Sequence, residues 1–541
     1  MNILIAGAWP YANGPLHIGH IAALLPGDVL ARYHRLKGDR VCYVSGSDCH
    51  GTPISIAAER EGVPPGVVAD RWHADFVSCF DRLGFTYDLY TKTSDAHHVA
   101  FVQGLHRAMY ASGLVDERQT EQAWCERCGR FMPDRFVRGR CPRCNEAARG
   151  DQCEACGEVL EPERLLEPVC ALCGQAIAFR PSRHLFLRLS ALQGFLSDYL
   201  ARAAHWRKNA LGLTARYVQE GLPDRTLTRD LDWGIDVPKE GYKGKKIYIW
   251  AENVLGYLSA SQHWCDENGQ DWDAFWRSED ARHYYVHGKD NVPFHTVILP
   301  ALLQAAGGYH LPDRVASSEY LTLEGRKIST SANWAVWAGD LLDRYEADSI
   351  RYFLIANGPE KRNSDFTFRE FIHSHNAELL GAFGNLVNRT LAFAARYLGN
   401  RIPGGPPDEA VAQRVQVAFK SCGRLIEELE FKAALDEAFE LVRGLNRFYD
   451  ERRPWVTRTA DPARCAADIG TCAWAIANLS RLLEPFLPFS CARICAMLGL
   501  GEPAWGPVEL PAGELGPVDV LFRRIEEGRI AQEEQALTAG R

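Results

Sequence analysis

The chain has 541 residues, of which 46% are hydrophobic and 24% charged; this composition excludes a mainly disordered or fibrous protein, and the length predicts about three or four domains. It has no uncharged apolar run of about 18 residues and no basic, apolar leader, so we expect no membrane span and a cytoplasmic protein. The 61 basic and 69 acidic residues give a net charge of −8, so a nucleic-acid partner would need a local basic surface.

The first hundred residues alternate between strand and helix patterns. An apolar run at residues 3–8 precedes a loop rich in proline and glycine, and a helical pattern then extends from about Gly19 to Lys37. Residues 41–45 predict a second buried strand, and the order strand, helix, strand indicates a parallel sheet. Helical periodicity continues over residues 67–83 and 95–112.

Strand-like runs return much later in the chain, at Lys246–Trp250 and Tyr284–His287. The sheet is therefore predicted to be interrupted by an insertion over residues 116–230. From about residue 366 the pattern is almost wholly helical, and Pro403–Pro407 separates two of the helices. We expect no dimerisation domain after these helices, and hence a monomer.

Eight of the 17 cysteines form four Cys-x-x-Cys pairs between Cys125 and Cys173, whereas chance gives about 0.5 such pairs in the whole chain. The residues that follow the four pairs are Gly129, Asn145, Gly157 and Gly174. These types tolerate the left-handed turn in which backbone amides face the thiolates. Four thiolates complete one tetrahedral zinc ion, so eight predict two zinc ions. The alternative, a disulfide framework, requires an oxidising compartment. We expect the other nine cysteines to be small core residues.

Two histidines flank a glycine where the first helix is expected to begin, in the segment His17-Ile18-Gly19-His20. A helix N-terminus offers free amides and a positive dipole end, which suit a phosphate group. Gly19 leaves room for a base or a ribose, and the imidazoles could donate to phosphate oxygens as negative charge builds. The alternative is a capped helix with two incidental histidines.

A second candidate for phosphate binding is the loop Leu323–Ser331, which is rich in Gly, Ser and Thr and contains Arg326 and Lys327. Such a loop could close as a mobile clamp on a polyphosphate. By itself this pattern is weak, because a Gly-Arg-Lys turn is usually only a surface turn.

Together these segments resemble the class I aminoacyl-tRNA synthetases, and over nearly the whole chain the resemblance is closest to the methionyl-tRNA synthetase family. His17–His20 matches the first signature of the class, and Lys327–Ser331 matches the second, with Thr330 where the family usually has a lysine. The resemblance implies Mg²⁺ bound with ATP. It implies that the catalytic residues are His17, His20 and Lys327, and that the ATP-binding residues are Gly19, Lys289, Asp290, Arg326 and Thr330.

Other segments of the resemblance imply a methionine pocket. Ser47–Pro53 matches the segment whose acid holds the methionine ammonium group, which assigns that role to Asp48, and a carboxylate is the natural partner of an ammonium. Gly288–His295 matches the segment that contacts the ribose, through Asp290, and the pocket. Aromatic faces suit a thioether. The methionine-binding residues implied in this way are Ala8, Trp9, Tyr11, Asp48, Trp250, Tyr257, Asn291 and His295.

The resemblance also implies the zinc ligands and an anticodon site. The four Cys-x-x-Cys pairs, called knuckles below, match the doubled, two-zinc form of the family's connective insertion. In that form one zinc is held by Cys141, Cys144, Cys153 and Cys156, and the other by Cys125, Cys128, Cys170 and Cys173. The family reads the CAU anticodon at the positions of Asn385, Arg389 and Trp455, where an amide and a guanidinium can bind unstacked bases and an indole can stack on one.

The expected fold is therefore α/β, with a doubly wound Rossmann-type parallel sheet, interrupted by a zinc-knuckle connective insertion and followed by an α-helical bundle that binds the anticodon. The expected domains are the two halves of the catalytic domain at 1–115 and 231–320, the insertion at 116–230, the signature-loop and stem-contact region at 321–365, and the anticodon domain at 366–541. The expected activity is formation of methionyl-adenylate from L-methionine and ATP, followed by transfer to tRNA(Met).

Three alternatives remain at this stage. One is a class I synthetase for another aliphatic amino acid, although those for Leu, Ile and Val carry a much larger editing insertion. Another is a paralogue with weakened activation that binds RNA or regulates, which is favoured by Thr330, Asn253 and Trp9, residues that depart from those common in the family. The last is a synthetase-like enzyme that makes a small amide or ester, which need not keep the anticodon residues.

Overall fold

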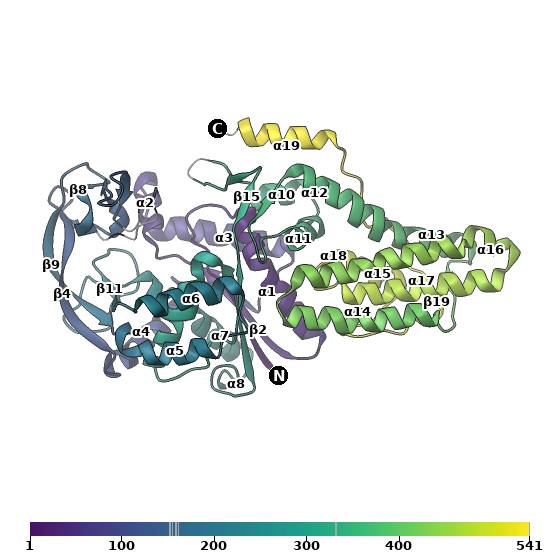
Figure 1. Ribbon diagram of the computed structural model, residues 1–541, viewed down its shortest axis with the longest axis horizontal. Helices are drawn as coiled ribbons and strands as arrows, with labels where there is room; N and C mark the ends of the chain where they lie inside the picture. The colour runs from purple at the N-terminus through teal and green to yellow at the C-terminus, as the bar shows by residue number, and fades with distance from the viewer. Residues whose placement is uncertain (151–152, 154, 157–159, 161, 331–332, 540–541) are drawn as a thin grey trace.

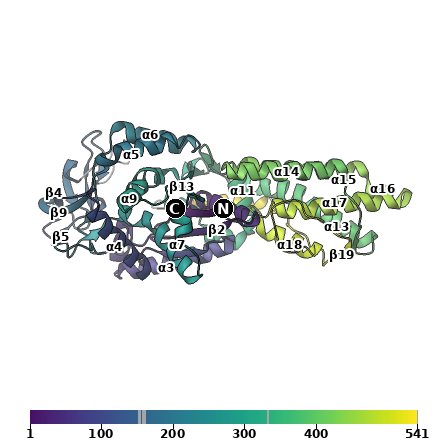
Figure 2. The ribbon, with the colours of Figure 1, turned by 90° about the horizontal axis from the view of Figure 1, so that it is seen from below.

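The computed structural model describes residues 1–541 except 151–152, 154, 157–159, 161, 331–332 and 540–541; Gly157 and Ser331 thus lie outside the described residues. The molecule is elongated (Figure 1), with the cysteine-rich insertion at one end, a parallel sheet in the middle and a helical bundle at the other end. The view from below, in Figure 2, shows the same three parts in line.

The central sheet has five strands: β1 (Asn2–Gly7), β2 (Arg40–Ser47), β3 (Leu89–Lys92), β13 (Ala281–Gly288) and β14 (Arg314–Ser318). Their order is β14-β13-β1-β2-β3, and all neighbours are parallel. This is the doubly wound arrangement predicted from the sequence. The chain changes direction across the sheet between β1 and β13, and ligands of such sheets bind at the carboxyl ends of the strands at that point.

Alternate side chains of each strand enter opposite cores, as the period of a strand requires. Ile3 and Ile5 of β1 contribute to one core, and Leu4 and Ala6 contribute to the other. The first core is shared with α1 (Ile18–Leu36), α2 (Thr52–Glu61) and α3 (Pro65–Leu83). The second is shared with α4 (Ala96–Ala111), α7 (Gly256–Glu267), α8 (Asp273–Trp276) and α9 (Leu299–Ala305).

The insertion begins with a long antiparallel ribbon of β4 (Val115–Cys125) and β9 (Ala178–Leu187), which β5 (Arg130–Phe131) and β10 (Arg225–Thr226) extend to four strands. The cysteine knuckles lie around a second small sheet of β6 (Val137–Arg140), β7 (Ala147–Arg149) and β8 (Leu166–Cys170). Two helices, α5 (Gln193–Ala201) and α6 (Lys208–Glu220), return to the central domain and share its second core.

The strand expected at Lys246–Trp250 is wrong in its extent and its place. Only Lys246–Ile247 form a strand, β12, which pairs with β11 (Thr228–Arg229) outside the central sheet. The chain then turns through two 3-10 segments, Ile249–Ala251 and Asn253–Leu255. A short apolar run has no period that separates a strand from such turns, and here tertiary packing bends the chain so that Trp250 and Asn253 both line one cavity.

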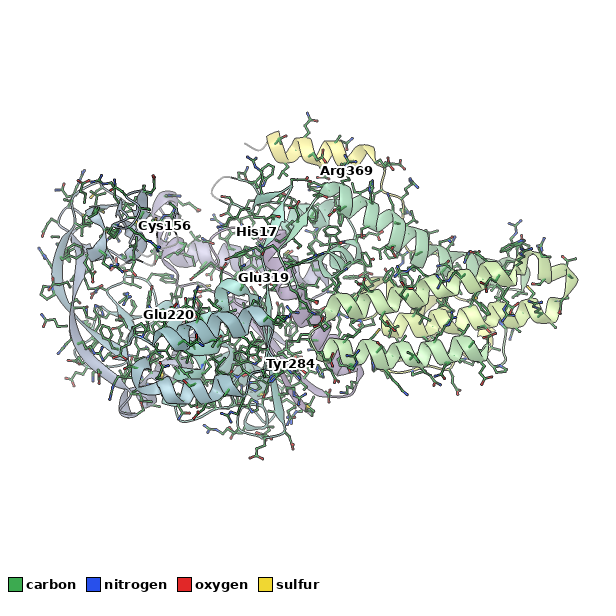
Figure 3. The ribbon with its side chains drawn as sticks, viewed as in Figure 1. His17, Cys156, Glu220, Tyr284, Glu319 and Arg369 are labelled. Carbon is green, nitrogen blue, oxygen red and sulfur yellow. The ribbon has the colours of Figure 1, made fainter. Side chains whose placement is uncertain are left out.

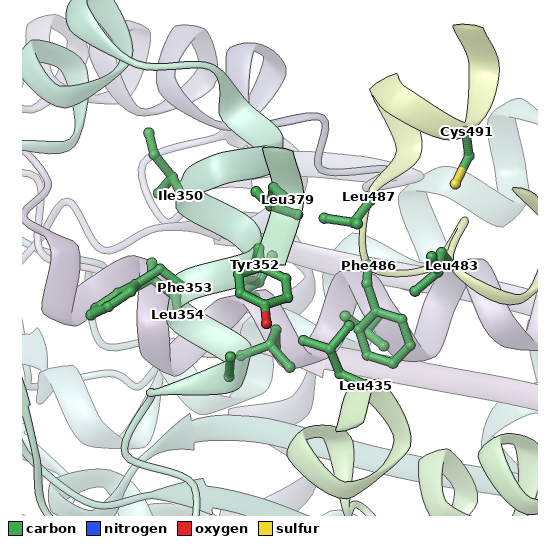
Figure 4. Close-up of a cluster of buried hydrophobic side chains, with 14 of the residues drawn as sticks. Ile350, Tyr352, Phe353, Leu354, Leu379, Leu435, Leu483, Phe486, Leu487 and Cys491 are labelled. Carbon is green, nitrogen blue, oxygen red and sulfur yellow. The ribbon is translucent and has the colours of Figure 1, made fainter. Parts of the chain in front are cut away.

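The loop that carries the second signature, called the signature loop, starts in a small sheet of β15 (Leu321–Leu323), β16 (Arg326–Lys327) and β17 (Ser364–Phe366). Two helices, α10 (Ala338–Arg344) and α11 (Ala347–Ala356), lie between β16 and β17 in the sequence. The side chains of α11 join the catalytic part to the bundle. In Figure 4, Ile350, Tyr352 and Phe353 of this helix lie in one buried cluster with Leu435 and Phe486 from the bundle.

The bundle confirms the helices predicted after residue 366. It consists of α12 (Phe368–Ser374), a π-helical segment His375–Gly384, α13 (Asn385–Tyr397), α14 (Glu409–Glu427), α15 (Phe431–Arg452), α16 (Pro454–Ala460), α17 (Pro462–Leu482) and α18 (Pro488–Leu498), with a short pair β18 (Arg401–Ile402) and β19 (Gly513–Glu514). The last helix, α19 (Gly528–Ala539), returns along α12 (Figure 1). Among the described residues, no helix is long and apolar enough to cross a membrane.

Candidate active site

The N-terminus of α1 carries both histidines of the first signature, at the carboxyl end of β1. His17 is the N-cap, and its Nδ1 accepts a hydrogen bond from the Gly19 amide (3.1 Å). His20 Nδ1 accepts from the His17 amide in return (3.2 Å), and the two rings stack with centroids 3.8 Å apart. The histidines therefore form a reciprocal capping box, and Figure 3 shows His17 near the centre of the molecule.

The same contacts fix the state of the two rings. Burial lowers the pKa of His17 to about 4, and burial together with the charge of His17 holds the pKa of His20 well below its ordinary value. Because each Nδ1 accepts a bond from an amide, each neutral ring carries its proton on Nε2. The helix start thus offers two neutral N–H donors. The free amides expected there are not found, because Gly19 N donates to His17, Ile18 N donates to the Val336 carbonyl, and His20 N donates to the His17 carbonyl (2.9 Å).

The second signature lies close to this helix start. Val336 and Ala338, which follow the second signature, bond to the chain where α1 begins: Ile18 N donates to Val336 O (3.0 Å), and Ala338 N donates to Leu16 O (2.8 Å). A Cβ atom added to Gly19 would lie 3.5 Å from Ile328 Cδ1. Arg326 and Lys327 are exposed on β16, and Thr330 is exposed after it. The signature loop and the histidines therefore border the same space.

Lys289 and Asp290 follow β13, which lies beside β1 at the point where the chain changes direction across the sheet. Lys289 Nζ is paired with Glu319 (2.6 Å), and Asp290 accepts a hydrogen bond from the Tyr320 hydroxyl. Both partners follow β14, so the predicted ATP-binding residues come from the ends of three elements: α1, β13 and the signature sheet.

All eight residues predicted to bind methionine line one cavity of about 280 Å³, close to the range of about 300–1,000 Å³ usual for small-molecule sites. They come from the loop after β1, the segment after β2, the 3-10 turns at 249–255, α7 and the segment after β13. Asn253, Arg229, Tyr248 and Phe294 line it too.

Asp48 is the buried carboxylate of this cavity, with 1% of its surface exposed. Its oxygens accept from Asn253 Nδ2 (3.0 Å) and from the His50 amide (3.4 Å). Burial and the nearby negative charge of Glu252 raise the pKa of Asp48 to about 7. A buried carboxylate of this kind gains its ionised form when a cation arrives, as the ammonium of an amino acid would.

Trp9 forms a fixed wall of the cavity because two glycines make room for it. A Cβ atom at Gly46 would lie 2.5 Å from Trp9 Cζ3, and one at Gly256 would lie 2.6 Å from Trp9 Cζ2. The indole therefore fits between β2 and the start of α7, and any larger residue at either glycine would displace it.

His295 and Tyr257 form an uncharged corner. His295 Nδ1 lies 2.8 Å from the Asn291 carbonyl, which can only accept, and burial lowers the His295 pKa to about 4. The neutral ring therefore accepts, at Nε2, a hydrogen bond from the Tyr257 hydroxyl (2.7 Å). This corner offers aromatic faces and no cation, which suits a thioether.

The eight knuckle cysteines form two tetrads, Cys125/Cys128/Cys170/Cys173 and Cys141/Cys144/Cys153/Cys156, each with its four sulfur atoms within 4.8 Å of one another. These are the groupings that the resemblance implied. The Sγ–Sγ distances include 3.4 and 3.9 Å in one tetrad and 3.8 and 3.5 Å in the other, close to the value of about 3.8 Å for thiolates on a tetrahedral ion with bonds of about 2.3 Å. Each tetrad could hold a metal ion. Figure 3 shows Cys156 in the part of the molecule far from the bundle.

The knuckle turns have the expected backbone. Gly129, Asn145 and Gly174 adopt φ angles of 63°, 64° and 73°, and the amides of Cys128 and Arg143 approach the sulfur atoms of Cys125 and Cys141 at 3.5 and 3.4 Å. All 17 cysteines lie among the described residues and carry free thiols, so the disulfide framework is wrong. Of the nine cysteines outside the tetrads, eight are buried, and Cys495 is half-buried.

The predicted anticodon residues lie in the bundle. Asn385 is exposed at the start of α13. Arg389 donates to Asp450 (2.7 Å) and to the Asn446 carbonyl (2.8 Å), and its guanidinium lies 4.1 Å from the Tyr449 ring centroid. Trp455 is 50% exposed on α16, with its ring 6.3 Å from that of Tyr449. Tyr449 therefore lies near both Arg389 and Trp455.

Several residues of the cavity region were missed by the sequence analysis, notably Arg229, His50, His98 and Glu252. Arg229 lines the cavity with its guanidinium 4.2 Å from the Tyr248 ring centroid. His98 lies on α4, about fifty residues from Asp48 in the chain, and reaches the site only through the fold. A buried Glu such as Glu252 is a signal in a structure, but the sequence gives no burial for it.

Comparisons with known proteins give the same family over nearly the whole chain. The family described as class I tRNA synthetases (M) matches residues 3–391, and the anticodon-binding domain of methionyl-tRNA ligase matches residues 402–540. Methionine–tRNA ligase 1 of Alkaliphilus oremlandii is 49% identical over 538 residues, with 99% of each chain covered. A methionine–tRNA ligase of Bacillus cereus is 50% identical, with 98% of each covered. The solved Mycobacterium tuberculosis methionyl-tRNA synthetase in complex with methionyl-adenylate has the same fold, with a TM-score of 0.81 and 24% identity over 97% of this chain and all of that one.

Proposed function

Because the chain belongs to the methionyl branch of the class I tRNA synthetases, we propose that it is a methionine–tRNA ligase. It activates L-methionine with ATP and transfers the methionyl group to tRNA(Met). The observation that carries this proposal is the cavity in which the buried carboxylate of Asp48 faces aromatic walls and an uncharged corner.

In the first step, a carboxylate oxygen of methionine attacks the α-phosphorus of ATP. The bond from that phosphorus to the bridging oxygen breaks, and pyrophosphate leaves. Asp48 holds the ammonium group, and the stacked histidines at the start of α1 donate their Nε2 protons as hydrogen bonds to phosphate oxygens whose charge grows. Arg326 and Lys327 close over the leaving group. Mg²⁺ bound to ATP neutralises part of the phosphate charge when present.

In the second step, a ribose hydroxyl of the terminal adenosine of tRNA attacks the methionyl carbonyl. The hydroxyl proton is lost to a neighbouring base or to solvent, the carbonyl–phosphate oxygen bond breaks, and AMP leaves. Most of the catalysis is positioning. We assign recognition of the anticodon to Asn385 and Arg389 of α13 and Trp455 of α16, two helices of the bundle at the end of the molecule opposite the insertion (Figure 1).

The cysteine tetrads are assigned to two structural zinc ions. Four thiolates leave a tetrahedral ion without an open position, so this site supplies folding energy to the insertion and no chemistry. We further propose that the protein acts as a monomer in the cytoplasm. We also propose that the insertion spans residues 116–230 and the anticodon domain residues 366–541; the start of β4 at Val115 and the start of α12 at Phe368 support the first residue of each.

The experiment that tests this function measures ATP–pyrophosphate exchange with each of the twenty amino acids, followed by charging of tRNA. The proposal predicts exchange with methionine above all others and charging of tRNA(Met). Exchange that prefers leucine, isoleucine or valine would favour another class I synthetase, and tRNA binding without exchange would favour the RNA-binding paralogue.

A further inference from the structure

Glu252 is a carboxylate buried completely behind the amino-acid cavity, and it does not line that cavity. Both of its oxygens are occupied: Oε1 lies 2.9 Å from His50 Nδ1, and Oε2 lies 3.0 Å from His98 Nε2. His98 is itself held by Ser259 Oγ, 2.7 Å from its Nδ1. The residue thus joins segments that are far apart in the sequence.

These contacts connect the two halves of the catalytic domain, which the insertion separates in the sequence. His50 and His98 precede the insertion, whereas Glu252 and Ser259 follow it. A third histidine, His106 of α4, makes a similar link, because its Nε2 lies 2.9 Å from the carbonyl of Ala251. The 3-10 turns that carry Trp250 and Asn253 into the cavity are therefore anchored to the first half of the catalytic domain by three histidines.

Two residues linked to Glu252, Asn253 and His50, donate hydrogen bonds to the Asp48 carboxylate. Asn253, next to Glu252 in the chain, donates to Asp48 Oδ2 at 3.0 Å. The backbone amide of His50, whose ring Glu252 holds, lies 3.4 Å from Asp48 Oδ1. One hydrogen bond to the Asp48 carboxylate therefore comes from the chain neighbour of Glu252, and the other comes from the backbone of the residue whose ring Glu252 binds.

Stability alone is a poor reason for such an arrangement. Burying a carboxylate costs several kcal/mol before its partners compensate, and buried ion pairs can often be replaced by apolar residues without loss of stability. The value of a buried, fully bonded charge lies more in a unique geometry, and here the geometry it defines is that of the carboxylate in the cavity.

We propose that Glu252 is a positioning residue for the ammonium group of the amino acid, acting through Asn253 and His50 on the Asp48 carboxylate. This proposal rests on the function proposed above, because it assumes that Asp48 receives the ammonium. Glu252 does not touch the substrate. Its contribution is the direction in which the Asp48 oxygens point.

The test compares two ligands on the Glu252→Gln variant of the full chain. One is methionine, and the other is 4-(methylthio)butanoate, which has the same side chain and carboxylate but lacks the ammonium. Equilibrium dialysis measures both affinities. We expect the variant to bind methionine about tenfold more weakly or worse, the effect of one lost strong hydrogen bond. The affinity for the analogue should change by less than about twofold, within the error of such comparisons.

Glu533→Gln provides a matched control. Glu533 is also a buried glutamate with 5% exposure, bonded to Tyr345 (2.9 Å) and Arg344 (2.9 Å), but it lies on α19, outside the cavity. This control should change neither affinity. If Glu252→Gln does not yield folded protein, Ser259→Ala tests the same chain of contacts more gently, by removing the partner of His98 Nδ1 while Glu252 remains on Nε2, and should weaken methionine binding selectively by about threefold.

Equal weakening of both ligands, or no weakening of either, overturns the proposal, because a merely structural role does not distinguish the ammonium. Failure of the proposed function looks different: in that case the unmodified protein itself does not bind methionine.

Discussion

Replacing Asp48 with asparagine is expected to stabilise the free protein at neutral pH while it abolishes methionine binding. In the folded protein the pKa of Asp48 is raised from 3.8 to about 7 by burial and by the charge of Glu252. When folding raises the pKa of a carboxyl, the free energy of unfolding of the protein falls as the pH rises from the unfolded pKa to the folded pKa. In this range only the unfolded chain releases the proton. A difference of about three units, at about 1.4 kcal/mol each, gives about 4 kcal/mol as an upper bound.

Asparagine has the shape of the protonated acid and carries no charge, and it can still accept from Asn253. The two proteins should therefore be equally stable near pH 4, and the variant should become more stable as the pH rises, by up to about 4 kcal/mol above pH 7. Urea denaturation of both proteins between about pH 4 and 8, without ligand, measures this difference. A difference that does not change with pH, or a variant that is less stable at pH 8, would refute the assigned burial and charge of Asp48.

Three further predictions follow from other parts of the site. The KM for methionine in ATP–pyrophosphate exchange should be constant above about pH 7 and should rise about tenfold per unit below it, because Asp48 must be ionised to hold the ammonium; a KM that is flat down to pH 5.5 contradicts this role. Elemental analysis should find two zinc ions per chain, and Cys153→Ser should remove one of them and leave exchange largely intact; a variant that keeps both ions contradicts the tetrad. Trp455→Ala should weaken tRNA(Met) binding by about 1–3 kcal/mol, the value of one stacked base, with unchanged exchange, since the ring is half exposed on α16 and far from the cavity; charging with unchanged affinity contradicts an anticodon contact.

Patterns that are local in the sequence predicted most of the fold. The strand, helix, strand order at the N-terminus, the later helices and the break at Pro403–Pro407 all depend on periodicity or on proline, and the structure confirms them. The knuckle turns depend on residue types that accept a positive φ, and Gly129, Asn145 and Gly174 adopt it. The grouping of cysteines into tetrads came from the family resemblance, because spacing alone leaves the pairing of four knuckles open.

Features that depend on tertiary contacts could not be predicted in this way. The run Lys246–Trp250 has the composition of a strand, but packing bends it into 3-10 turns. The anchoring of Glu252 by His50 and His98 joins residues on both sides of the insertion, and no local pattern marks them. The fit of Trp9 between Gly46 and Gly256 likewise depends on two elements meeting.

The central claim is that the start of α1 stabilises the charge that develops on the phosphates while the adjacent cavity holds methionine. Rapid-quench measurement of methionyl-adenylate formation in the variant with His17 and His20 both changed to Ala tests it most directly. Loss of two oriented donors predicts a rate lower by about 10³-fold or more, with methionine affinity unchanged, because neither ring lines the cavity. Adenylate formation at the rate of the unmodified protein would contradict the account.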